Sequence, residues 1–145
     1  MTETRDALAE LLDRAEAHLV GKRYRDCHSL CLEAVRAEPA HPHPYFLLGV
    51  LAAEHGNTVK ALELFERAVA LNPQPARYHA QLARCLVRAH RHDEALAAAQ
   101  RASERGPDDA FTLDTIGVVL SLLGRHGEAL DYFRRALAYA PDSAE

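Results

Sequence analysis

The chain has 145 residues, 48% of them hydrophobic, and a formal net charge of −4. That length suffices for one domain with a core, while the acidic balance argues against a general nucleic-acid binder, which needs a basic surface. No apolar run could span a bilayer, the N-terminus is too polar for a secretory signal, and three cysteines do not make a disulfide framework, so we expect a cytoplasmic protein that binds no membrane.

Four prolines stand 34 residues apart, and other positions follow the same register. The prolines are Pro39, Pro73, Pro107 and Pro141, and five residues before them stand Ala34, Ala68, Ala102 and Ala136. Two further columns hold only small residues: Cys27, Ala61, Ala95 and Ala129, and Ala15, Gly49, Ala83 and Gly117. A fixed period of this length indicates a repeat protein in which small residues let paired helices approach closely.

The first repeat departs from the pattern. Arg14 stands in a column that is apolar elsewhere, which fits a terminal repeat with one face against solvent. Cys27 and Cys31 share a helix face and could hold a soft metal together with His28. A closed zinc site needs further ligands at suitable spacing, however, and both cysteines stand in packing columns. We therefore predict no metal site here.

The second repeat shows the local signals most clearly. His41–Pro44 alternates histidine with proline and predicts an extended linker. Residues 45–55 follow as a helix, and Gly56 with Asn57 predicts a turn. An amphipathic helix over residues 59–71 then ends before Pro73, which has no N–H to donate.

The third and fourth repeats differ at the turn and in the second helix. His90 replaces the turn glycine that the fourth repeat has as Gly124, and Ala99 stands where that repeat has Phe133. The small residues of the third repeat predict a weaker or differently curved interface. A metal site at His90 and His92 lacks a third ligand in the sequence.

The arrangement of small and large residues resembles the tetratricopeptide repeat family over roughly residues 8–143. The resemblance is carried by Leu48-Gly49 and Ile116-Gly117, by Phe65 and Phe133, and by the alanines and closing prolines. It implies an all-α fold, a right-handed superhelix (α-solenoid) of antiparallel helical hairpins. Its four units would be residues 8–41, 42–75, 76–109 and 110–143, within one domain 1–145.

The resemblance also implies that the first helix of each repeat lines a concave groove that takes up a protein or peptide. Carried over position by position, the predicted groove residues are His43, Phe46, Val50, Arg77, Arg84, Arg88, Phe111, Asp114 and Val118. Family members that grip acidic chaperone tails share a Lys/Asn/Arg clamp. This sequence has Leu12, Glu16 and Leu47 at the corresponding positions, so we predict no chaperone-tail binding.

Arginines at positions 77, 84, 88 and 91 fall on one stripe of a helix. Flanked by apolar groove residues, such a stripe suits an acidic peptide with apolar anchors, because arginine binds carboxylates in bidentate fashion. The alternative is that Glu54 and Asp114 neutralise the stripe across neighbouring helices, which would imply no ligand.

No phosphate-binding loop, nucleophile elbow or metalloprotease motif is present, so we predict a scaffold without catalytic activity or cofactor. Two alternatives remain open. The chain could be the N-terminal recruiting module of a larger sulfotransferase or glycosyltransferase. The last hairpin, with Leu130, Phe133 and Leu137, could instead support a homodimer. The high content of Ala, Arg and His hints at a bacterial source.

Overall fold

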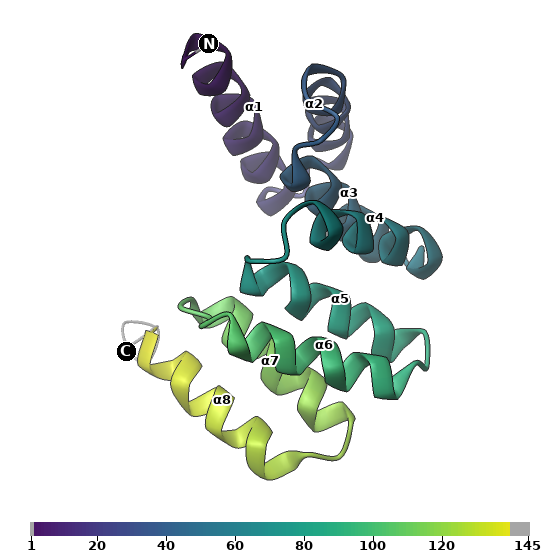
Figure 1. Ribbon diagram of the computed structural model, residues 1–145, viewed down its shortest axis with the longest axis vertical. Coiled ribbons are helices and arrows are strands. Elements are labelled where there is room, and N and C mark those ends of the chain that lie inside the picture. Colours follow the sequence, from purple (N-terminus) through teal and green to yellow (C-terminus); the bar gives the residue numbers. More distant parts are fainter. Residues whose placement is uncertain (1, 140–145) are drawn as a thin grey trace. The chain divides into compact units, whose positions relative to one another are not determined.

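The computed structural model describes residues 2–139, and in that part of the chain it contains eight helices and no strand. They are α1 (Thr2–Val20), α2 (Tyr24–Ala37), α3 (Pro42–Glu54), α4 (Thr58–Leu71), α5 (Ala76–Arg88), α6 (His92–Glu104), α7 (Ala110–Leu122) and α8 (His126–Tyr139). Consecutive helices pair as hairpins, α1 with α2 through to α7 with α8 (Figure 1). The prediction of an all-α chain of antiparallel hairpins is confirmed.

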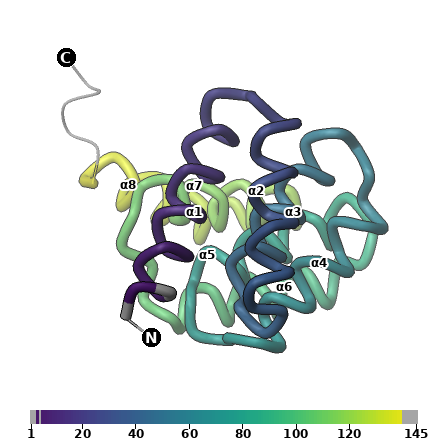
Figure 2. Tube along the Cα trace, turned by 90° about the horizontal axis from the view of Figure 1, so that it is seen from above, coloured from purple at the N-terminus to yellow at the C-terminus, as the bar shows by residue number. Residues whose placement is uncertain are grey.

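The hairpins form two compact units. The N-terminal unit, Met1–Asn72, contains α1 to α4, and the C-terminal unit, Pro73–Glu145, contains α5 to α8. Within the first unit α1 and α2 both contact α3, and within the second α5 and α6 both contact α7. Short turns join the paired helices (Figure 2). We predict that the chain forms one domain, residues 1–145, with a superhelical course. Both points depend on how the two units are placed relative to each other, and both stay predictions.

The helix α3 begins earlier than the sequence predicts. The expected extended linker over His41–Pro44 is wrong, because α3 starts at Pro42. The first N–H groups of a helix have no intrahelical partner, so proline loses nothing there and its fixed φ suits the helix. The ring Nδ1 of His41 accepts a hydrogen bond from the His43 N–H at 3.2 Å and caps this end.

The ends of the second helices agree with the spacing of the prolines. Helices α2, α4 and α6 end two or three residues before Pro39, Pro73 and Pro107. Pro141, predicted to stop the last helix, lies outside the described residues. None of the described helices has the length and the apolar character needed to cross a bilayer.

Two hairpins are closed by a glycine that lies directly against a phenylalanine ring. A Cβ added to Gly49 on α3 would stand 2.7 Å from Cε1 of Phe65 on α4, and one added to Gly117 would stand 2.6 Å from Cε1 of Phe133. Carbon atoms do not approach so closely without displacing their neighbours. Glycine therefore sets the separation of the two helices in these hairpins.

In the other two hairpins the same contact between paired helices is made by side chains of different size. Ala15 and Ala83 occupy the glycine column, while Cys31 and Ala99 occupy the phenylalanine column, and all four are fully buried. The larger residue in the first column is thus matched by a smaller one in the second. The third repeat, which has Ala83 in place of glycine and Ala99 in place of phenylalanine, follows this pattern.

A side-chain hydrogen bond ties the start of two hairpins to the preceding proline. The Tyr45 hydroxyl donates to the Pro39 carbonyl at 2.6 Å, and His79, in the same column one repeat later, makes a 2.6 Å hydrogen bond to the Pro73 carbonyl. Arg105 also donates to the Pro73 carbonyl, from Nε at 2.9 Å. The buried His79 therefore replaces a tyrosine and keeps its function as a donor.

The turn inside each hairpin needs one residue with positive φ. This residue is Gly56 in the second repeat and Gly124 in the fourth, but Lys22 in the first (φ 60°) and His90 in the third (φ 59°). A side chain costs about 1–2 kcal/mol in this conformation. Lys22 and His90 therefore carry backbone strain that the two glycine turns avoid.

Replacing Gly49 with alanine should lower the free energy of unfolding by about 1–3 kcal/mol, because the new methyl group overlaps the Phe65 ring. In Gly49→Ala/Phe65→Leu the loss should be smaller than the sum of the two single losses. Gly127 on α8 is the matched control, since a Cβ there meets no atom within 4 Å. Gly127→Ala should stabilise the chain by up to about 1 kcal/mol in urea unfolding. Similar losses at Gly49 and Gly127 would contradict the close contact.

Replacing Lys22 or His90 with glycine should raise the free energy of unfolding by about 0.5–1 kcal/mol, because the strain outweighs the added freedom of the unfolded glycine. The reverse change, Gly124→Ala, should lower it by about 1 kcal/mol. Thermal unfolding followed by circular dichroism measures both. If His90→Gly instead lowered the midpoint, contacts of the imidazole would outweigh the strain.

Stability should fall in acid through His79. Burial lowers the pKa of His79 below its usual value, and its Nδ1 has no hydrogen-bond partner among the described residues. The unfolded state therefore binds this proton more readily, and stability is lost as the pH drops below about 6.5. His79→Gln, which can still donate to Pro73 but does not titrate, should flatten the dependence of the melting temperature on pH. Parallel curves for the two proteins would contradict this origin.

Candidate functional site

The predicted groove residues divide between the two units. His43, Phe46 and Val50 lie on α3 in the N-terminal unit. The other six lie on α5 and α7, which pack side by side in the C-terminal unit: Arg77, Arg84, Arg88, Phe111, Asp114 and Val118. The structure therefore brings two-thirds of the predicted residues onto one pair of neighbouring helices, called here the α5–α7 face.

On α5 the two arginines Arg84 and Arg88 lie one helical turn apart, the first half-buried and the second exposed. In the described part of the chain neither side chain makes an ion pair. Asp114, predicted as a neutralising partner on the neighbouring helix, is exposed and forms no ion pair within residues 2–139 either. Two guanidinium groups are thus left with their donors available.

The arginines in the hairpin turns behave differently. Arg91, the fourth member of the predicted stripe, hydrogen-bonds Glu94 through Nε at 2.9 Å, and Arg125 donates to Glu128 at 2.9 Å. The hydrogen bond from Arg91 lowers the pKa of Glu94 below its usual value. These arginines act within their own turns, whereas Arg84 and Arg88 do not.

The α7 side of the face is apolar. Phe111 is 65% exposed and Leu122 is 62% exposed, with the half-buried Val118 between them at helical spacing. In the 34-residue register Phe111, Val118 and Leu122 are the counterparts of the three arginines on α5. Large exposed apolar side chains that share a stripe are typical of an interaction surface. Leu122 extends this stripe by one helical turn beyond Val118.

Among the three predicted residues on α3, Phe46 is buried, whereas His43 and Val50 are half-buried. Phe46 is only 5% exposed, because its ring stacks on His43 and tilts against Phe65, both at 5.7 Å between ring centroids. His43 Nε2 lies 3.7 Å from Glu16 Oε1 on α1, and Val50 is half-buried. Phe46 chiefly stabilises the N-terminal unit, and its contact with a ligand stays a prediction.

The cysteines and histidines form no metal centre in the part of the chain that the structure describes, where no three His, Cys, Asp or Glu side chains are placed to share an ion. Cys27, Cys31 and Cys85 are buried, and none of them forms a disulfide within residues 2–139. The hydrogen bond to Cys27, together with burial, raises the pKa of the Cys31 thiol. Because a thiol rather than a thiolate is favoured, Cys31 is poorly suited to bind a metal. His90 and His92 place their rings edge to face at 6.1 Å.

Comparison with solved structures places the hairpins among known repeat proteins. The chain matches MamA (22% identity, TM-score 0.67, covering 94% of this chain and 80% of that one) and YrrB (22%, 0.64, 97% and 80%), likenesses of fold. It also matches the O-GlcNAc transferase of Thermobaculum terrenum, with 29% identity and a TM-score of 0.80 over 93% of this chain but 27% of the transferase. No match was found among curated protein sequences.

The sequence itself matches the Tetratricopeptide repeat family in three overlapping or adjoining segments, residues 12–76, 52–111 and 110–143. Together these segments span nearly every helix described above, and they agree with the 34-residue register of prolines and small residues. The chain belongs to the tetratricopeptide repeat family.

Proposed function

We propose that the chain is a protein-interaction scaffold whose α5–α7 face binds an acidic peptide or helix with apolar anchors. The observation that carries this proposal is that Arg84 and Arg88 on α5 make no ion pair within residues 2–139, while the neighbouring helix α7 exposes Phe111 and Leu122. A bound segment would supply carboxylates to the arginines and apolar side chains to α7.

The energetics favour such a partner over a purely solvated face. Covering an exposed phenylalanine or leucine is worth about 1.5–3 kcal/mol. Arginine adds bidentate hydrogen bonds to carboxylates, and aromatic and arginine residues often dominate binding energy. Ionic contacts at the rim would chiefly set specificity and the rate of association.

The fold is compatible with this use. YrrB, a protein of the same fold, is described as having an unusual peptide-binding site. That description concerns YrrB, and it supports peptide binding here only as something that such hairpins can do. We further propose that the chain itself is not an enzyme, needs no cofactor and works in the cytoplasm.

A second candidate is a recruiting module of a glycosyltransferase. The likeness to the Thermobaculum terrenum O-GlcNAc transferase favours it, since the present chain corresponds to about a quarter of that protein. In this case the α5–α7 face would hold the protein substrate of a separate catalytic domain. The open reading frame in the source genome decides: an in-frame transferase domain would support this candidate, and its absence would remove it.

Selection from a library of displayed peptides tests the scaffold proposal. The wild-type chain should enrich peptides that combine Asp or Glu with Phe, Leu or another large apolar residue. Arg84→Glu/Arg88→Glu should lose affinity for the selected peptides by about a hundredfold, since it replaces two attractive charges with repulsive ones. Raising the salt concentration should weaken the wild-type complex.

The matched control changes charge equally on other helices of the same unit. Arg101 on α6 and Arg135 on α8 are both exposed, and Arg101→Glu/Arg135→Glu should retain binding. Circular dichroism confirms that each variant remains helical. Equal affinity of wild type and Arg84→Glu/Arg88→Glu for the selected peptides would refute binding through the α5–α7 face.

A further inference from the structure

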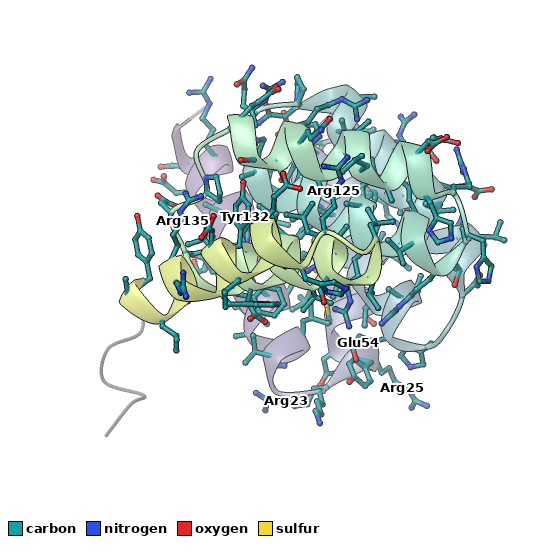
Figure 3. The ribbon with its side chains drawn as sticks, turned by 90° about the horizontal axis from the view of Figure 1, so that it is seen from below. Arg23, Arg25, Glu54, Arg125, Tyr132 and Arg135 are labelled. Carbon is teal, nitrogen blue, oxygen red and sulfur yellow. The ribbon has the colours of Figure 1, made fainter. Side chains whose placement is uncertain are left out.

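The helix α8 leaves two leucines uncovered on one side. Leu130 is 47% exposed and Leu137 is 66% exposed, and because they are seven residues apart they lie on one stripe. The buried Ala129 and Ala136 face α7. At about 100° per residue, both leucines lie on the same side of this buried stripe. Figure 3 shows α8 with Tyr132 and Arg135, and the Arg135 guanidinium lies 5.0 Å from the centre of the Tyr132 ring.

The register shows what this side of a second helix does elsewhere in the chain. The counterpart of Leu137 in α2 is Val35, and the counterpart of Leu130 in α6 is Leu96. Both are half-buried, and α2 and α6 each pack against the helix that follows, α3 and α7. This side of a second helix is therefore the one that receives the next repeat, and α8 presents it uncovered.

The first hairpin offers the opposite side. A cleft of about 600 Å³ opens between α1 and α2, which diverge towards the N-terminal end of α1 (Figure 1). Its lining is Ala7, Leu8, Glu10, Leu11, Arg14, Glu33, Ala37 and Glu38. On α2, Glu33 and Ala37 lie across the buried Cys27–Ala34 stripe from Val35. Within each unit a second helix packs against the first helix of the following hairpin, α2 on α3 and α6 on α7. Leu11 on α1 is the counterpart of Tyr45, which donates to Pro39 at the end of the preceding repeat. The α1 wall of the cleft is thus on the side where a preceding repeat would pack.

We propose that α8 of one molecule packs into the α1–α2 cleft of a second copy, so that the repeat continues from copy to copy. Leu130 and Leu137 meet the apolar part of the lining, formed by Ala7, Leu8, Leu11 and Ala37. Arg134, which is exposed beside the leucines and lies 3.9 Å from Asp131, would meet a lining with three glutamates and one arginine. The two surfaces are different, so the contact is heterologous. A pair of molecules therefore still has one free α8 and one free cleft, through which further copies can bind.

This inference does not depend on the α5–α7 face, and sedimentation velocity of the full chain over a wide concentration range tests it. The wild type should form species larger than a dimer as its concentration rises. Leu137→Asp, which removes the α8 contact, and Ala7→Glu/Ala37→Glu, which blocks the cleft at exposed positions, should each remain monomeric. Val59→Asp, at an exposed apolar position on α4, is the matched control and should assemble like the wild type.

Mixing the two defective variants gives the decisive result. Leu137→Asp keeps an intact cleft and Ala7→Glu/Ala37→Glu keeps an intact α8, so an equal mixture should form a 1:1 pair that does not grow further. Circular dichroism beforehand shows that both variants are folded.

Three results would overturn the proposal. A wild type that is monomeric at every concentration would refute the contact between copies. Dimers of the cleft variant alone, with Leu137→Asp monomeric, would indicate a symmetric contact between two α8 helices. A mixture that remains monomeric would exclude the pairing of α8 with the cleft.

Discussion

The contact of Gly49 with the Phe65 ring, repeated by Gly117 with Phe133, is the constraint on which each of these hairpins depends. It brings two helices so close that neither can carry a larger residue at the contact. Because the ring fills the space beside the glycine, the paired helices pack tightly against each other at this contact. The alanines that replace glycine elsewhere are matched by Cys31 or Ala99, so the hairpin persists although the residues differ.

Because the packing inside each hairpin uses buried side chains, the side chains on the outer faces are available for binding. The side chains that hold the hairpins are small or apolar and buried, whereas Arg84, Arg88, Phe111 and Leu122 contribute little to the core and lie on the surface. The same division separates the turn arginines, which pair locally with Glu94 and Glu128, from the arginines of the α5–α7 face. Binding residues can therefore vary in such a chain without disturbing the packing of the helices.

Much of the fold could be predicted from spacing alone. The period of the prolines, the small columns and the turn glycines determine where helices begin, pair and end, because each rests on local stereochemistry. The start of α3 could not be predicted, since the tolerance of a helix for proline in its first turn outweighed the extended preference of His41–Pro44. The burial of Phe46 was also missed, because it depends on the ring of Phe65 in another helix and on His43. The groove positions could be proposed because they follow from the register, but the register does not reveal which of them are buried.

The central functional claim is that an acidic, apolar partner binds on α5 and α7 of the C-terminal unit. Nuclear magnetic resonance titration of the labelled chain with an acidic peptide containing phenylalanine tests it most directly. The account predicts that the largest shifts occur at the Nε groups of Arg84 and Arg88 and at the backbone amides of α5 and α7. Shifts confined to the outer helices α6 and α8, or to the N-terminal unit, would contradict it.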